Sequence, residues 1–163
     1  MSTCCFIGHR KIPDNKQFYF AVKKSIKKLI DDGVTIFLFG SRSKFNDLCL
    51  KIVTEFKKNY PQLIRVFVRA EYEYIDQNYE NFLLEQYERT YYSKQAHSAG
   101  RLAYIKRNQD MIDQSDVCIF YYDDSYKLST NKTSGTKIAF EYSKTKNKNL
   151  INIYDLICAT TLS

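Results

Sequence analysis

Residues 3–10 read TCCFIGHR, an apolar run that stops at a glycine followed by a histidine and an arginine. A short apolar run bounded by glycine is typical of a β-strand buried on both faces. The same pattern returns at residues 34–40, VTIFLFG. Further apolar runs stand at residues 63–68, 117–122 and 150–153, so the sequence predicts five buried strands.

Segments with the spacing of amphipathic helices separate these runs. Phe18, Val22, Ile26 and Leu29 recur every three or four residues, and four lysines between residues 23 and 28 fall on the opposite face. Further helices are expected at about residues 45–60, at about residues 101–114 and from residue 134 onward, after a polar loop at 123–133. Strands that alternate with helices indicate an α/β fold. We therefore expect a Rossmann-like three-layer sandwich with a mainly parallel five-stranded sheet.

The stretch at about residues 71–100 departs from this alternation. It holds six tyrosines among many charged residues and shows no clean strand pattern. We interpret it as an irregular excursion or a small helical cap on a single domain spanning residues 1–163. Its tyrosines have two open interpretations, stacking on a base or packing on the edge of the sheet. They are Tyr72, Tyr74, Tyr79, Tyr87, Tyr91 and Tyr92.

Composition narrows the class of protein. The 163 residues are 44% hydrophobic and 26% charged, with 5 Gly and 2 Pro, which fits one soluble domain and excludes a collagenous or disordered chain. No apolar run has the roughly 18 residues that cross a membrane, so we expect a cytoplasmic protein with no membrane partner. The 5 Cys form no close CxxC pair, which favours packing in the core over a metal or redox site.

The net charge of +7 favours a phosphorylated or polyanionic partner. However, 18 of the 25 basic residues are lysines in a chain also rich in Tyr, Ile and Asn. This composition also fits a coding bias, so charge alone does not identify the partner.

Glycine, hydroxyl and arginine residues follow the ends of the predicted strands. Gly8, His9 and Arg10 follow the first strand, residues 40–43 (GSRS) follow the second, and residues 134–136 (SGT) begin a helix after the fourth. Each could be an ordinary turn with a helix cap. Together, at the edge where parallel sheets bind ligands, they indicate a phosphate site, because backbone N–H groups, hydroxyls and guanidinium groups all donate to phosphate oxygens.

Three stretches carry a resemblance to a known family: residues 3–12 (TCCFIGHRKI), 107–122 (RNQDMIDQSDVCIFYY) and 134–153 (SGTKIAFEYSKTKNKNLINI). They resemble the SLOG superfamily, which unites Lonely-Guy phosphoribohydrolases, DNA-processing protein A and nucleotide-sensing domains. The chain is most similar to small stand-alone bacterial and phage SLOG proteins. The resemblance implies a Rossmann-like nucleotide pocket, and also a homo-oligomer.

The resemblance assigns ligand-binding roles position by position. The turn after the second strand departs from the family, which often has a second glycine where Arg42 stands. Arg107 and Asn108 match a region that supplies a catalytic arginine in Lonely-Guy enzymes. With Asp47 added as a possible partner of a ribose hydroxyl, the predicted ligand-binding residues are Gly8, His9, Arg10, Gly40, Ser41, Arg42, Asp47, Arg107, Asn108, Ser134, Gly135 and Thr136.

A carboxylate needed for catalysis is missing from its usual place. N-glycosidases with related folds have a glutamate two or three residues after the threonine of the GT turn, where this chain has Ile138 and Ala139. Breaking an N-glycosidic bond without it requires a substitute. The nearby candidates for a substitute are Asp47, Asp123 and Asp124, because Glu141 lies more than half a turn round the helix from where such a glutamate would point. The candidate catalytic set is Arg107, Glu141 and Asp123.

Several single residues have two interpretations. His9 could contact a ligand or could fix its loop through backbone hydrogen bonds. Arg107 could face the pocket or could pair with Asp110 or Asp113 at the surface. His97 is expected at the surface, and neither histidine has metal-ligand spacing, so no metal or cofactor is expected.

Three functions remain open. The sequence favours a protein that binds a nucleotide or nucleotide-derived signal, as a sensor or a sequestering protein. The alternative is a nucleoside-monophosphate N-glycosidase. The third is single-stranded nucleic-acid binding, since positive charge and interleaved tyrosines suit that ligand.

Overall fold

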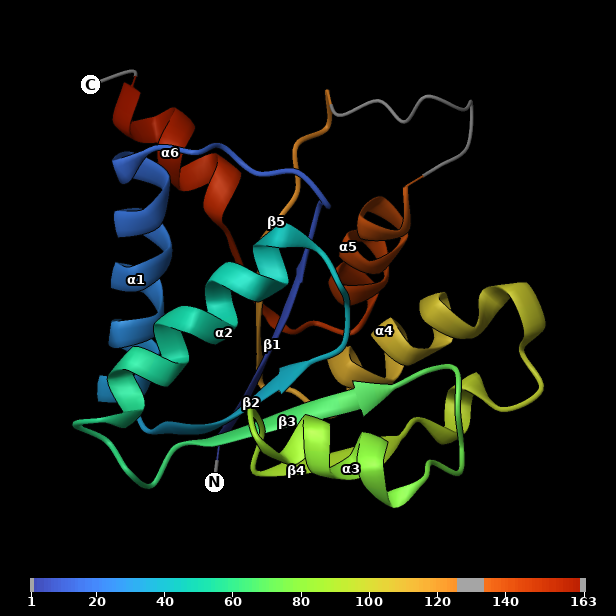
Figure 1. Cartoon of the computed structure of the whole chain (residues 1–163). Helices are drawn as coiled ribbons and strands as arrows, with labels where there is room; N and C mark the ends of the chain where they lie inside the picture. Colours follow the sequence, from blue (N-terminus) through green and yellow to red (C-terminus); the bar gives the residue numbers. More distant parts are fainter. Residues whose placement is uncertain (1, 126–133, 162–163) are drawn as a thin grey trace.

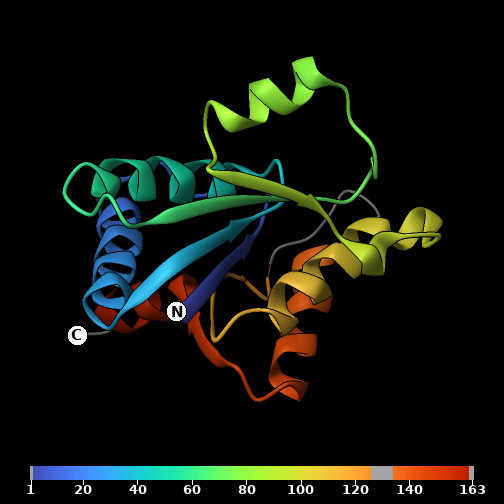
Figure 2. The same cartoon turned by 90° about the horizontal axis from the view of Figure 1, so that it is seen from below.

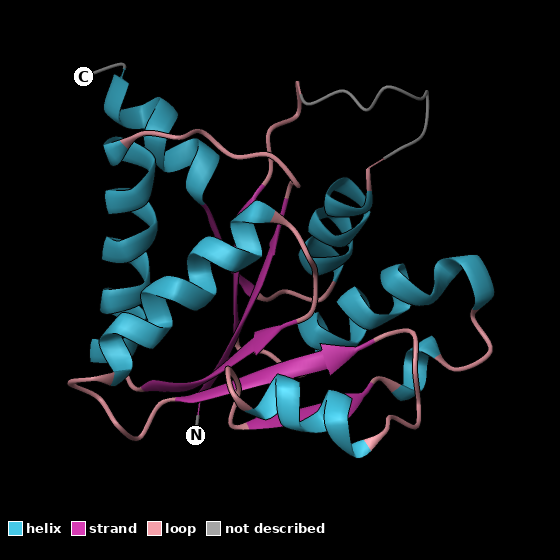
Figure 3. Ribbon diagram, in the orientation of Figure 1, coloured by secondary structure: helices cyan, strands magenta, loops and turns pink. Residues whose placement is uncertain are grey.

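The computed structural model describes residues 2–125 and 134–161, so most of the expected loop at 123–133 lies outside the described residues. Six strands form one sheet in the order β4-β3-β2-β1-β5-β6, and every neighbouring pair is parallel (Figures 1 and 3). The strands are β1 (Ser2–Gly8), β2 (Val34–Phe39), β3 (Ile64–Arg69), β4 (Arg89–Tyr92), β5 (Val117–Tyr121) and β6 (Asn149–Asn152).

Helices connect the strands. They are α1 (Lys16–Asp31), α2 (Lys44–Lys57), α3 (Gln77–Leu84), α4 (Ala103–Asp113), α5 (Gly135–Thr145) and α6 (Ile153–Thr161), with short 3-10 turns η1 (Lys94–Ala96) and η2 (Gly100–Leu102).

The helices cover both faces of the sheet, as the view from below shows (Figure 2). Cys4 and Phe6 of β1 point to one face, where the core includes buried residues of α1, α2 and α6. Cys5 and Ile7 point to the other face, where α4 and α5 supply the core. The Rossmann-like three-layer sandwich predicted from the sequence is therefore confirmed.

The predicted number of strands was wrong, because the sheet has six strands rather than five. The sixth, β4, and helix α3 lie within the stretch at 71–100, which the sequence suggested was irregular. β4 is a four-residue edge strand with no fully buried residue, so it shows no apolar run. Helix α6 was also not predicted, because its apolar residues continue directly from β6 and hide the change of period.

An ion pair anchors the start of β4 to β3. The side chain of Arg65 donates to both carboxylate oxygens of Glu88, at 2.6 and 3.1 Å, and the backbone N–H of Arg65 donates to the same carboxylate at 2.7 Å. Burial alone raises the pKa of Glu88, but the hydrogen bonds from Arg65 outweigh it and lower the pKa to about 2. This charged pair holds the start of the edge strand in addition to the parallel backbone pairing and the packing of Tyr91 against the core.

Four of the five cysteines are in the core, which confirms the sequence expectation for them. Cys4, Cys5, Cys49 and Cys118 are each fully buried, and burial raises the pKa of the Cys4 and Cys49 thiols well above the usual value. Cys158 on α6 is partly exposed, and none of the five cysteines forms a disulfide. Across residues 2–125 and 134–161, His, Cys, Asp and Glu side chains form no group of three that could hold a metal ion. None of the described helices has the length and apolar character to span a bilayer.

Gly8 brings the start of α2 onto the end of β1. A Cβ at this position would lie 2.3 Å from the Phe45 ring, so only glycine allows this contact. Phe45 is fully buried, and the neighbouring Lys44 N–H donates to the carbonyl of Arg10 at 3.1 Å. This packing places the loop after β1 beside the first turn of α2.

Candidate functional site

A cleft of about 680 Å³ lies at the carboxyl ends of β1, β2 and β3. It is lined by the loops that follow these strands, by α3 and α4, and by the first turn of α5. In parallel sheets this edge is where ligands bind. The lining residues are 7–10, 40–43, 67, 69–72, 79, 104, 107–108 and 134–136.

Two helices begin at the cleft with a serine cap. The Ser43 hydroxyl accepts from the N–H of Asn46 at 3.1 Å at the start of α2, and the Ser134 hydroxyl accepts from the N–H of Lys137 at 3.1 Å at the start of α5. Helix N-termini carry a partial positive charge and free N–H groups. Apart from its own neighbours in the chain, no atom of the described residues lies within 4 Å of where a Cβ of Gly135 would stand.

Arg107 forms a fixed wall of the cleft. Its guanidinium donates to the carbonyl of Gly40 and, at 3.2 Å, to the side chain of Asn108. Gly40 makes this possible, because a Cβ there would lie 2.8 Å from Cδ of Arg107. Burial lowers the pKa of Arg107 to about 10, so the group keeps its charge at neutral pH. The surface ion pair with Asp110 or Asp113, the alternative from the sequence, is not formed.

Arg69 ends β3 and orders the loop that follows it. Its guanidinium donates to the carbonyls of Tyr72 at 3.0 Å and Glu73 at 3.4 Å, while its buried Nε has no hydrogen-bond partner among the described residues. Because these bonds hold the loop, residues 70–72 stand as one side of the cleft.

Arg10 and Arg42 differ from these two arginines. Both are exposed and line the cleft, and neither guanidinium has a hydrogen bond or ion pair with a residue in the described part of the chain. Two guanidinium groups that have no partner among residues 2–125 and 134–161 therefore stand in the same cleft as the two helix starts.

Glu71 brings a carboxylate into the cleft, and its charge acts on Arg107. The carboxylates named from the sequence lie elsewhere. The Asp123 carboxylate accepts from the Ser125 hydroxyl at 2.6 Å, and Glu141 is exposed on α5. Neither residue is among the described residues that line the cleft.

His9 lines the cleft but is only 2% exposed, and its ring fixes two loops. The ring Nε2 accepts from the backbone N–H of Asp123 at 3.0 Å, and the His9 N–H donates to the carbonyl of Tyr121 at 3.3 Å. These contacts correspond to the second interpretation from the sequence, a histidine that holds its loop. Burial lowers the pKa of His9, so the ring is neutral near neutral pH.

We predict that His9 makes the fold sensitive to mild acid. Its pKa is lowered in the folded protein, so as pH falls below about 6.5 the unfolded chain takes up the proton first. The contribution of neutral His9 to the free energy of unfolding is thus complete above that pH. It is lost as the pH falls toward the pKa of His9 in the folded protein, by at most about 1.4 kcal/mol per pH unit. Urea unfolding at pH 7.5 and 5.0 should show a smaller loss for His9→Gln than for the wild type. Equal losses in the two proteins would contradict the prediction.

The structure brings eleven of the twelve predicted ligand-binding residues to the cleft. The exception is Asp47, which lines a second cavity of about 320 Å³ next to it. His97 is at the surface as expected, 3.5 Å from the Glu73 carboxylate. Tyr72 and Tyr79, two of the tyrosines for which the sequence left base stacking open, also line the cleft, whereas the sequence reasoning missed Arg69, Glu71 and Tyr104. Arg69 could have been found, because it directly follows the third predicted strand.

Comparison with known proteins identifies the family to which the chain belongs. No curated protein matches the chain. Among solved structures, it is similar to DNA processing protein A from Helicobacter pylori, whose structure is described as showing a single-stranded DNA binding mode. The identity is 14%, the match covers 98% of this chain and 80% of that chain, and the TM-score is 0.48. The family model described as the YspA SLOG family (YpsA) matches residues 8–156, so the chain belongs to the SLOG superfamily as a member of this family.

Proposed function

We propose that this protein binds a nucleotide or a nucleotide-derived signal and holds its phosphate groups in the cleft. The observation that carries the proposal is a pair of guanidinium groups, Arg10 and Arg42, which no described residue pairs with and which lie in the same cleft as the capped starts of α2 and α5. Guanidinium forks and helix N-termini are the two groups that proteins most often use for phosphate oxygens.

The rest of the cleft supports the same ligand. Arg107 keeps its positive charge while its hydrogen bonds hold it in one place, so the wall is ordered before a ligand arrives. A preordered site loses less entropy on binding. The net charge of +7 also attracts anions over a longer range.

Retention of a mixed nucleotide panel during ultrafiltration tests the proposal. The folded protein at micromolar concentration should retain one nucleotide class, which denaturation then releases intact. A panel that passes through the filter unchanged, at concentrations up to millimolar, would contradict the proposal. A labelled single-stranded oligonucleotide in a parallel assay examines the nucleic-acid alternative, for which binding weakens steeply as salt rises.

One observation favours a second function, hydrolysis of an N-glycosidic bond. Glu71 places a carboxylate near the Arg107 guanidinium inside the cleft, although the glutamate of related glycosidases is absent. A carboxylate can stabilise positive charge on the ribose as the base leaves. Release of free base by the wild type and its loss in Glu71→Gln would support this function. Intact nucleotide after long incubation would exclude it.

A further inference from the structure

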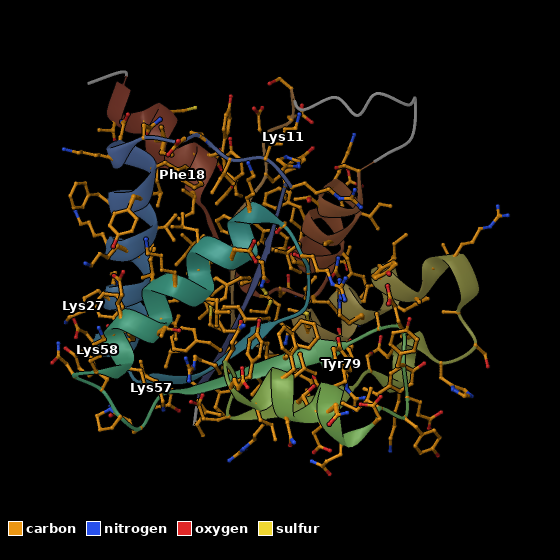
Figure 4. All side chains as sticks on the ribbon, viewed as in Figure 1. Lys11, Phe18, Lys27, Lys57, Lys58 and Tyr79 are labelled. Carbon is orange, nitrogen blue, oxygen red and sulfur yellow. The ribbon has the colours of Figure 1, made fainter. Side chains whose placement is uncertain are left out.

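The second cavity opens beside the cleft and shares part of its lining. Ser41, Arg42, Phe67 and Tyr79 border both spaces, so one ligand can extend from the cleft into the cavity. Tyr79, on α3, is labelled in Figure 4. The volume of about 320 Å³ is at the lower end of the range for ligand pockets.

Four of the nine described residues that line the cavity are aromatic. The rings of Phe67 and Tyr87 lie 5.2 Å apart, and those of Tyr79 and Phe82 lie 6.4 Å apart and nearly parallel. Phe82 is 54% exposed, so much of its surface is free for contact with another ring. Stacking of a base on such rings is favourable and does not depend on its identity. The cavity wall therefore suits a planar ring.

Two polar side chains lie on the same wall, Asp47 from α2 and Gln86 after α3. Neither side chain has a hydrogen bond or ion pair with a described residue. Asp47 and Tyr87 line the same cavity. Burial, with a further contribution from the charge of Asp47, raises the pKa of Tyr87 to about 12. An ionised carboxylate only accepts hydrogen bonds, whereas an amide both donates and accepts. A ring that enters the cavity therefore meets an acceptor at Asp47.

We propose that the second cavity is the base subsite of the nucleotide and that Asp47 selects guanine over adenine. Guanine carries two adjacent donors on its Watson–Crick edge, N1–H and the 2-amino group, and one carboxylate accepts from both. Its O6 is an acceptor, for which the Gln86 amide supplies a donor. Adenine places the lone pair of its N1 at the same edge, where a carboxylate repels it. This inference rests on the proposed function, because the phosphates must lie in the adjoining cleft.

Calorimetric titration with matched pairs, GMP and AMP, GDP and ADP, and GTP and ATP, tests the inference. The wild type should bind the guanine member of the tightest pair about ten- to a hundredfold more strongly, the range expected for one bidentate contact to a base. Asp47→Asn removes the charge without changing the size of the side chain. It should remove most of this preference by weakening the guanine nucleotide.

The matched control is Asp155→Asn, the same substitution in the first turn of α6 at an exposed position that lines neither cavity. It should bind both nucleotides as the wild type does. Equal affinity for guanine and adenine nucleotides in the wild type would overturn the base assignment and leave the proposed function intact. An equal loss for both nucleotides in Asp47→Asn would also overturn it, because it places Asp47 on the ribose. Failure of all six nucleotides to bind would contradict the proposed function itself.

Discussion

Replacing Arg10 and Arg42 together by glutamine is expected to weaken nucleotide binding by about a hundredfold or more without changing the fold. Each guanidinium can form charge-assisted hydrogen bonds with phosphate, and a hydrogen bond to a charged group contributes about 1.5–3 kcal/mol. Both side chains are exposed and have no hydrogen bond or ion pair with described residues, so their loss removes no contact on which the fold depends. Calorimetric titration measures the affinity, and thermal unfolding checks the stability.

The control for this experiment must change the net charge by the same amount. Arg89→Gln with Arg101→Gln does so at two exposed positions that do not line the cleft. If the nucleotide binds in the cleft, the affinity of this control should fall only a few-fold at low salt, because the control loses only long-range electrostatic attraction. A loss in the control as large as that in Arg10→Gln/Arg42→Gln would show that overall charge, and not this cleft, binds the nucleotide.

Phe45→Ala is expected to lower the free energy of unfolding by about 3–5 kcal/mol, because it removes a fully buried aromatic ring. Gly8→Ala should cost about 1–3 kcal/mol for the opposite reason, since its Cβ would lie 2.3 Å from that ring. Both changes affect the contact that sets the loop after β1 against the first turn of α2.

The double variant Gly8→Ala/Phe45→Ala distinguishes this contact from two unrelated effects. With the ring removed, the two closest contacts of the added methyl, at 2.3 and 2.5 Å, are gone, and the Cβ of residue 45 at 2.8 Å remains. The double variant should therefore cost less than the sum of the single variants. Urea unfolding of the four proteins measures this difference. If the losses in the free energy of unfolding simply add, the contact with Phe45 is not the reason why position 8 needs a glycine.

The central strands were predictable because they are buried on both faces. Neither residues 3–7 nor residues 34–39 have a face that is exposed to solvent, so each segment is a nearly continuous apolar run in the sequence. β4 (Arg89–Tyr92) could not be found in this way, because an edge strand needs no continuous apolar run. Its position depends on a partner 23 residues earlier, the Arg65 that binds Glu88, and no local pattern reveals such a pairing.

The sequence predicted those residues of the candidate site that come directly after an apolar strand. It did not predict the contacts between distant residues or most of the residues contributed by the stretch at 71–100. Gly40 and Arg107 were each named from the sequence, but their contact across 67 residues appears only in the fold. Glu71 was missed because it belongs to the stretch without a clean strand pattern, whereas Tyr79 in the same stretch was named with base stacking as one of two interpretations. Asp47 was named for a single pocket, whereas it lies in the second cavity.

The five glycines allow the most direct test of the nucleotide site. Gly8, Gly40 and Gly135 line the cleft, while Gly33 follows α1 and Gly100 begins η2, both outside the cleft. In protein labelled with ¹⁵N only at glycine, addition of a nucleotide should shift the amide signals of Gly8, Gly40 and Gly135 in a saturable way. Gly33 and Gly100 should stay in place. Saturable shifts at Gly33 and Gly100, with none at the three glycines of the cleft, would contradict a nucleotide site at this edge of the sheet.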